Sequence, residues 1–92
     1  MDLEKVVLVG VVLPHQSEEE VESSLHELSL LTETAQGKSV STILQNRERV
    51  DSATYVGKGK LEEIKAVVDE LGCTAVIFNG ELSPSQQRNL ER

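Results

Sequence analysis

Two glycines alternate with two lysines in Gly57-Lys58-Gly59-Lys60, directly before a run with helical spacing that begins at Leu61. Glycine permits positive φ and a close approach of the backbone to a ligand. The first turn of a helix leaves N–H groups unpaired and partially positive. Two lysine charges at such a turn favour an anion, such as a phosphate of a nucleotide or of RNA. The alternative is a glycine-punctuated turn with solvated lysines, and spacing alone favours that alternative because short Gly/Lys segments often match by chance.

The segment lacks the pattern of the two common phosphate loops. A Walker A loop ends in Gly-Lys-Ser/Thr, whose hydroxyl reaches Mg²⁺, but here Leu61 follows Lys60. The Gly-x-Gly-x-x-Gly pattern is also absent from the sequence. A nucleotide at this segment would therefore be bound by another mechanism.

Three arginines and one tyrosine extend the candidate site. Arg47 and Arg49 alternate, so they could contact phosphates or protect the edge of a strand from association. Tyr55 could stack on a base or pack against the protein. The candidate anion-, phosphate- or RNA-binding residues are Tyr55, Gly57, Lys58, Gly59, Lys60, Arg47, Arg49 and Arg88.

No set of residues predicts a catalytic or metal site. His15 has no assignable Ser, Cys or carboxylate partner, and two distant histidines with a single cysteine do not make a zinc site. That cysteine, Cys73, adjoins an apolar run and is interpreted as a small core residue. We expect no catalytic residue, no metal and no cofactor in this segment.

Composition indicates one small cytoplasmic domain. A chain of 92 residues supports a single thin core, and one cysteine fits a reducing compartment. No apolar run approaches the ~18 residues of a membrane span, and the N-terminus lacks a secretory signal. The net charge of −7 argues against extensive nucleic-acid binding. The acidic segment 17–36 is followed by a basic segment, 38–60, so a local phosphate contact remains open.

The hydrophobic pattern predicts alternating strands and helices. The runs 6–13, 40–45 and 73–78 are predicted strands, the first buried on both faces and the second at an edge. Helices are predicted after the caps Ser17 and Ser83 and from about residue 60 to residue 71, with Gly37 and Gly72 ending the first two. The expected buried face of the first helix consists of Val21, Leu25, Leu28, Leu31 and Ala35, and that of the second of Leu61, Ile64, Val68 and Leu71.

This β-α-β-α-β-α order predicts an α/β fold with a small open parallel sheet of three strands and a fourth strand missing. The loops 14–16, 46–59 and 79–82 then meet at the carboxyl edge of the sheet, where such folds bind ligands. The third helix has only Leu90 as an apolar anchor, which predicts that the chain is a fragment of a longer protein. The exposed edge of the third strand predicts dimerisation or strand exchange.

Two long motifs carry a specific resemblance. They are residues 53–60, Ala-Thr-Tyr-Val-Gly-Lys-Gly-Lys, and residues 76–91, which begin Val-Ile-Phe-Asn-Gly-Glu-Leu-Ser-Pro-Ser-Gln. With shorter matches in 7–11 and 18–31, the chain resembles the N-terminal domain of HflX, a family of ribosome-associated GTPases, over nearly its whole length. Val50 departs from the family, which often has proline there, and this bears on the rigidity of the loop.

The resemblance implies that residues 1–92 form the N-terminal α/β domain of a longer protein with a fourth strand, a helical segment and a GTPase domain. It implies GTP and Mg²⁺ in that GTPase domain, association with the large (50S) ribosomal subunit, and a role in ribosome splitting or rescue under stress. The partners of this segment would be ribosomal RNA and its own GTPase domain. No GTP-contacting residue is assigned to this chain.

Three hypotheses remain open. The segment could dock a GTPase onto ribosomal RNA, bind a purine nucleotide by itself with phosphates at residues 57–60, or face the GTPase domain and regulate hydrolysis. The resemblance favours the first and the third over the second.

Overall fold

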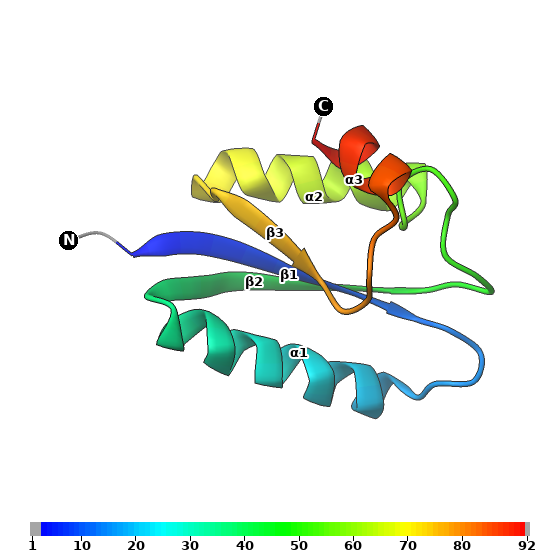
Figure 1. The fold of residues 1–92 in the computed structure, drawn as a ribbon, viewed down its shortest axis with the longest axis horizontal. Helices are drawn as coiled ribbons and strands as arrows, with labels where there is room; N and C mark the ends of the chain where they lie inside the picture. Colours follow the sequence, from blue (N-terminus) through cyan, green and yellow to red (C-terminus); the bar gives the residue numbers. More distant parts are fainter. Residues whose placement is uncertain (1–2, 92) are drawn as a thin grey trace.

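Three parallel strands form one open sheet in the order β2-β1-β3 (Figure 1). The computed structural model describes residues 3–91. In chain order the elements are β1 (Glu4–Val12), α1 (Glu18–Thr34), β2 (Gly37–Asn46), α2 (Lys58–Leu71), β3 (Ala75–Phe78) and α3 (Pro84–Leu90). Helix α1 covers one face of the sheet, and α2 and α3 lie on the other (Figure 1). The predicted α/β class and open parallel sheet are confirmed.

Strand β1 is the centre of the fold because both of its faces are apolar. Its residues 6–12 are all buried, as a strand covered by helices on both sides requires. Gly10 allows α1 to pack closely, since a Cβ there would lie 2.7 Å from Val21 Cγ1 and 2.9 Å from Leu25 Cδ1. β2 lies at one edge, as predicted, and β3 at the other.

Helix α1 begins as predicted, but its buried face differs at the C-terminal end. Ser17 Oγ accepts a hydrogen bond from the Glu20 N–H at 3.1 Å, which is the expected cap. Leu31 is 65% exposed, whereas Thr32 is buried and its hydroxyl donates to the Leu28 carbonyl at 2.8 Å. Successive helical residues are rotated by about 100°, so once Leu28 and Thr32 face the sheet, Leu31 faces solvent.

The chain leaves α1 by a different residue from the one predicted. Gln36 adopts the left-handed conformation, with φ 64°, and Gly37 is already the first residue of β2. Gly37 is needed for close packing, because a Cβ there would lie 2.8 Å from Thr32 Cγ2. The predicted end of α2 is confirmed, since Gly72 ends it with φ 68° and its N–H donates to the Val68 carbonyl. Leu71, expected on the buried face of this helix, is 37% exposed.

The loops that follow β1, β2 and β3 meet at the carboxyl edge of the sheet. The longest is residues 47–57, which connects β2 to α2 and which we call the basic loop, because it begins at Arg47 and leads into Lys58. Among residues 3–91, no helix has the length and apolar character needed to cross a membrane.

Candidate functional site

The N-terminus of α2 presents free backbone donors. The helix begins at Lys58, two residues earlier than predicted, with Gly57 as an N-cap that has no side chain to accept a hydrogen bond. The Gly57 N–H donates to Gln45 Oε1 at 3.0 Å, and the first helical bond runs from the Leu61 N–H to the Gly57 carbonyl at 2.9 Å. Within the described residues, the intervening N–H groups of the first turn have no partner, as expected for an uncapped helix start. They carry the positive end of the helix dipole.

The glycines of this segment do not adopt the positive φ that the sequence suggested. Neither Gly57 nor Gly59 has a positive φ, and the residue with the left-handed backbone is Tyr55, at φ 69°. Gly57 instead allows an arginine to approach, since a Cβ there would lie 2.6 Å from Arg47 Nη1. No atom lies within 4 Å of a Cβ placed on Gly59, so packing does not require glycine at that position.

Arg47 is the basic side chain that lies directly against the start of α2. Its Nε donates to the Arg49 carbonyl at 2.9 Å, which holds the guanidinium over Gly57. Arg49, two residues after Arg47, and Lys58, directly after Gly57, are exposed to solvent. Lys60 lies 3.3 Å from the Glu63 carboxylate, so its charge is partly compensated.

Arg88 lies apart from this cluster along the chain, on α3. It is exposed, and its Nη2 donates to Ser85 Oγ at 3.4 Å within the same helix. Among the basic candidates, the structure joins Arg47 to the Arg49 carbonyl and places its guanidinium against Gly57, the residue before Lys58.

Tyr55 packs inside the domain. It is buried, and its ring meets Phe78 edge to face with centroids 5.4 Å apart. Its hydroxyl donates to Asn79 Oδ1 at 3.4 Å. Burial raises the pKa of the Tyr55 phenol above its ordinary value. Of the two roles expected for Tyr55, stacking on a base or packing, the geometry corresponds to packing.

Asn79 fills the place where open α/β sheets bind ligands, and the sequence reasoning missed it. The helices after β1 and β3 lie on opposite faces of the sheet (Figure 1), so the crevice at the carboxyl ends of these strands is the topological switch point. Asn79 Oδ1 accepts from the Val11 N–H at 3.2 Å, and Nδ2 approaches the Val11 carbonyl at 3.5 Å. The side chain thus continues the pairing with β1 where β3 ends.

Tyr55 and Gly80 close the same crevice. The Tyr55 hydroxyl bonds to Asn79 and lies so near Gly80 that a Cβ on Gly80 would overlap it. The Asn-Gly pair directly after an apolar run was the signal available in the sequence. The crevice is filled by the protein's own side chains, and the free donors lie outside it, at the start of α2.

A tight turn inside the basic loop is built around Asp51. Its Oδ1 accepts from the N–H groups of Ala53 at 2.8 Å and Thr54 at 3.1 Å, and its backbone exchanges two 3.0 Å bonds with Tyr55. The hydrogen bonds from the Ala53 and Thr54 N–H groups hold the pKa of the Asp51 carboxyl below its ordinary value. The charge of Arg47 lowers this pKa further, and burial raises it by less than the hydrogen bonds lower it. Residues 51–55 form what we call the Asp51 turn.

Helix α3 is attached to the Asp51 turn by two side-chain amides. Gln86 is buried, and its Nε2 donates to the Asp51 carbonyl at 2.6 Å. Asn89 Nδ2 donates to the Ala53 carbonyl at 2.9 Å. The predicted cap of α3 is confirmed, since Ser83 and Gln86 form a complete capping box with Pro84 in the first turn. Polar contacts therefore hold this helix in place although Leu90 is its only apolar anchor.

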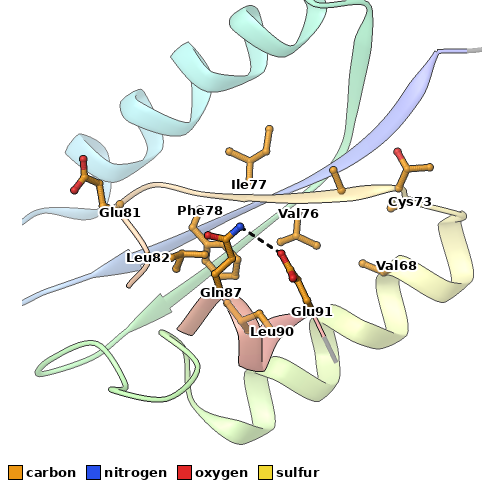
Figure 2. A pocket seen from close by; sticks show the side chains of 13 residues that line it. Val68, Cys73, Val76, Ile77, Phe78, Glu81, Leu82, Gln87, Leu90 and Glu91 are labelled. Atoms are coloured by element: carbon orange, nitrogen blue, oxygen red, sulfur yellow. Dashed lines mark hydrogen bonds between the residues drawn. The ribbon is translucent and has the colours of Figure 1, made fainter. Parts of the chain in front are cut away.

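A groove of about 890 Å³ runs along the outer edge of β3 (Figure 2). Val68 of α2, Val76 and Phe78 of β3, and Leu90 of α3 contribute its apolar lining. Gln87 and Glu91, joined by a 3.3 Å hydrogen bond, lie at its polar side (Figure 2). No strand pairs with this edge of β3 among residues 3–91.

Metal ligands do not cluster in the part of the chain that the structure describes: no three His, Cys, Asp or Glu side chains lie close enough to hold an ion. Cys73 is half-buried and packs at the border of the core beneath α2. His15 is exposed in the loop after β1.

Comparison with known proteins places the chain in a family. A family model described as GTP-binding GTPase N-terminal matches residues 22–92. The chain belongs to this family. It is 51% identical over 89 residues to a GTPase HflX from Alkalihalophilus pseudofirmus, which covers 97% of the chain and 21% of the relative. It is 42% identical over 92 residues to a GTPase HflX from Flavobacterium psychrophilum, covering 100% of the chain and 22% of the relative.

A more distant relative gives the same result. The GTPase HflX of Escherichia coli is 34% identical over 89 residues, which are 97% of this chain and 20% of the relative. The resemblance to the HflX N-terminal domain is therefore confirmed, and the chain spans about a fifth of the length of the curated relatives it matches. Both motifs that carried the resemblance lie within the matched residues, and the structure joins them by the Tyr55–Asn79 and Asn89–Ala53 hydrogen bonds.

Proposed function

We propose that this chain docks an HflX-type GTPase onto ribosomal RNA of the large (50S) ribosomal subunit in the cytoplasm, and helps to regulate that GTPase during ribosome splitting or rescue under stress. The observation that carries the proposal is the start of α2, where free N–H groups, the Arg47 guanidinium and the exposed Lys58 lie together. RNA phosphates suit such an open basic surface. GTP and Mg²⁺ would be bound by the GTPase domain of the longer protein.

The same geometry favours RNA, rather than a free nucleotide, as the ligand of this segment. A nucleotide bound in an open α/β fold normally uses the crevice at the switch point, and here Asn79, Tyr55 and Gly80 occupy that crevice. The surface at the start of α2 offers phosphate contacts without a pocket for a base. A purine nucleotide with phosphates at residues 57–60 remains the alternative, and it predicts saturable binding that is lost in Lys58→Ala and Lys60→Ala.

The test is calorimetric titration of the 92-residue chain with a short ribosomal RNA fragment, and separately with GTP and ATP, at several salt concentrations. We expect RNA binding that weakens with salt. Lys58→Ala and Arg49→Ala should each weaken it and lower the salt slope by about one. Lys38→Ala is the matched control, because Lys38 is an exposed lysine at the opposite end of β2. RNA binding that is absent, or equally affected by Lys38→Ala, would reject the docking role.

We also propose that the free edge of β3 pairs with a second strand, which in a solution of this chain alone belongs to a second copy. Strand β3 is uncharged, Ala-Val-Ile-Phe, and its outer edge is open to the groove, features that favour edge-to-edge association. Light scattering over a hundredfold range of concentration should show dimers. A monomer at every concentration would contradict the pairing.

A further inference from the structure

We propose that Gln86 and Asn89 are positioning residues: α3 acts as a latch that holds the basic loop in its phosphate-binding shape. The proposal deepens the docking function above and rests on it. The latch consists of two hydrogen bonds, from the Gln86 and Asn89 amides to the carbonyls of Asp51 and Ala53.

The first step is that α3 is attached mainly to the basic loop. Within the described residues, its hydrogen bonds to other parts of the chain are these two, and both end in the Asp51 turn. Its apolar contact is supplied by Leu90 at the half-open groove beside β3 (Figure 2). A seven-residue helix with so little buried apolar surface depends on its polar contacts for its position.

The second step is that the Asp51 turn lies between the two ends of the basic loop, close in the chain to the residues that hold Arg47 and cap α2. Toward the N-terminus, Arg47 and Arg49 are joined to each other by the 2.9 Å bond from the Arg47 side chain. Toward the C-terminus, Tyr55 leads to Gly57 within two residues, and Gly57 is the cap of α2 against which Arg47 lies. Because the Arg49 carbonyl holds the Arg47 side chain, we expect a shift of the turn to move Arg49 and to draw the guanidinium away from Gly57.

The third step is that the Gln86 and Asn89 side chains contact the turn only as hydrogen-bond donors, through their NH2 groups. Gln86 Oε1 is already used by the capping box, where it accepts from the Ser83 N–H at 2.8 Å, and only Nε2 reaches the turn. Glutamate at position 86 would keep the capping box and place a carboxylate oxygen against the Asp51 carbonyl. Gln86→Glu thus opens the latch without removing the helix cap.

The experiment compares Gln86→Glu and Asn89→Asp with Gln87→Glu. The control adds the same charge on the same helix, but Gln87 is exposed, and among residues 3–91 its side chain bonds only to Glu91, the C-cap residue of α3. Amide hydrogen exchange is measured by mass spectrometry in residues 51–57 and in β1, and RNA affinity is measured against salt on the same samples.

We expect Gln86→Glu and Asn89→Asp to speed exchange in residues 51–57 by about fivefold, which corresponds to the loss of one hydrogen bond, and to leave β1 unchanged. RNA affinity should fall severalfold with a smaller salt slope, because fewer phosphates are held at once. A variant that only lowered the fraction of folded protein would weaken RNA binding but leave the dependence of affinity on salt concentration unchanged. Gln87→Glu should preserve both the exchange rates and the salt slope.

Unchanged exchange in residues 51–57 would overturn the latch. Faster exchange with unaltered RNA affinity and slope would overturn the positioning role. If the unmodified chain binds no RNA, the docking function fails, while hydrogen exchange still decides whether α3 holds the loop.

Discussion

Helices α1 and α3, which lie on opposite sides of the sheet, are held in different ways. On one side, α1 packs on β1 through Val21 and Leu25, with Gly10 allowing the close approach. On the other side, α3 is joined to the basic loop by two amide groups. Apolar burial grows with area and has no direction, whereas each amide contact depends on one atom in one place. We infer that the apolar packing of α1 and α2 on the sheet sets the stability of the domain, whereas the two amides of α3 set the shape of its candidate site.

The strongest test of this comparison is Leu25→Ala on α1. Leu25 is 2% exposed and packs beside Val21 against Gly10, so the change removes buried methyl groups and leaves a cavity. We expect the free energy of unfolding to fall by about 3 kcal/mol, measured by urea titration. RNA binding by the folded fraction should persist, because the basic loop lies on the other side of the molecule.

Leu31→Ala is the matched control on the same helix. Leu31 is 65% exposed, so its truncation should change the free energy of unfolding by less than about 0.5 kcal/mol. An equal loss of unfolding free energy for Leu25→Ala and Leu31→Ala would contradict this view of α1. It would mean that Leu31 faces the sheet, as the sequence predicts.

A smaller effect is expected where the two motifs meet, at Gly80. A methyl group added by Gly80→Ala would overlap the Tyr55 hydroxyl, and we expect a loss of about 1–3 kcal/mol in the free energy of unfolding. In the Tyr55→Phe background the overlapping oxygen is gone and the nearest ring carbon is 3.3 Å away. Gly80→Ala should then cost clearly less in the double-mutant cycle, and an unchanged cost would show that Gly80 matters for some reason other than Tyr55.

The α1 side could be predicted from the sequence because its order is local and periodic. A buried central strand, a capped helix and its apolar spacing all follow from residues close together in the chain. The errors were local as well: Leu31 faces solvent because the face continues through Thr32, and Gln36 rather than Gly37 takes the left-handed turn.

The α3 side could be predicted only in part. The capping box at Ser83 was evident, but the contacts that place the helix join Gln86 to Asp51 and Asn89 to Ala53, 35 and 36 residues away. Single polar pairs at such separations leave no periodic pattern in one sequence. The Gly/Lys segment predicts a candidate site at the start of α2, but the filled crevice depends on Asn79, which contacts Val11 across 68 residues.

The smallest expected effect concerns the pH dependence of the Asp51 turn. The Ala53 and Thr54 N–H groups lower the pKa of Asp51 from its ordinary value of 3.8. A carboxyl whose pKa is lower in the folded state stabilises the fold above the unfolded pKa and loses that contribution as pH falls through the folded pKa. Because the carboxylate is exposed to solvent, the contribution is modest.

Asp51→Asn removes this titration and checks the sign. The variant should be less stable than the unmodified chain at pH 7, and the difference in free energy of unfolding should shrink steadily as pH falls below about 4. Asp69→Asn removes the same charge from an exposed carboxylate on α2 that makes no hydrogen bond within residues 3–91, and controls for net charge. A difference at Asp51 that stays constant down to pH 2.5, or grows, would mean that the ionised carboxylate is not what holds the turn. The turn would then rest on the backbone bonds between Asp51 and Tyr55 and on the Gln86 and Asn89 amides.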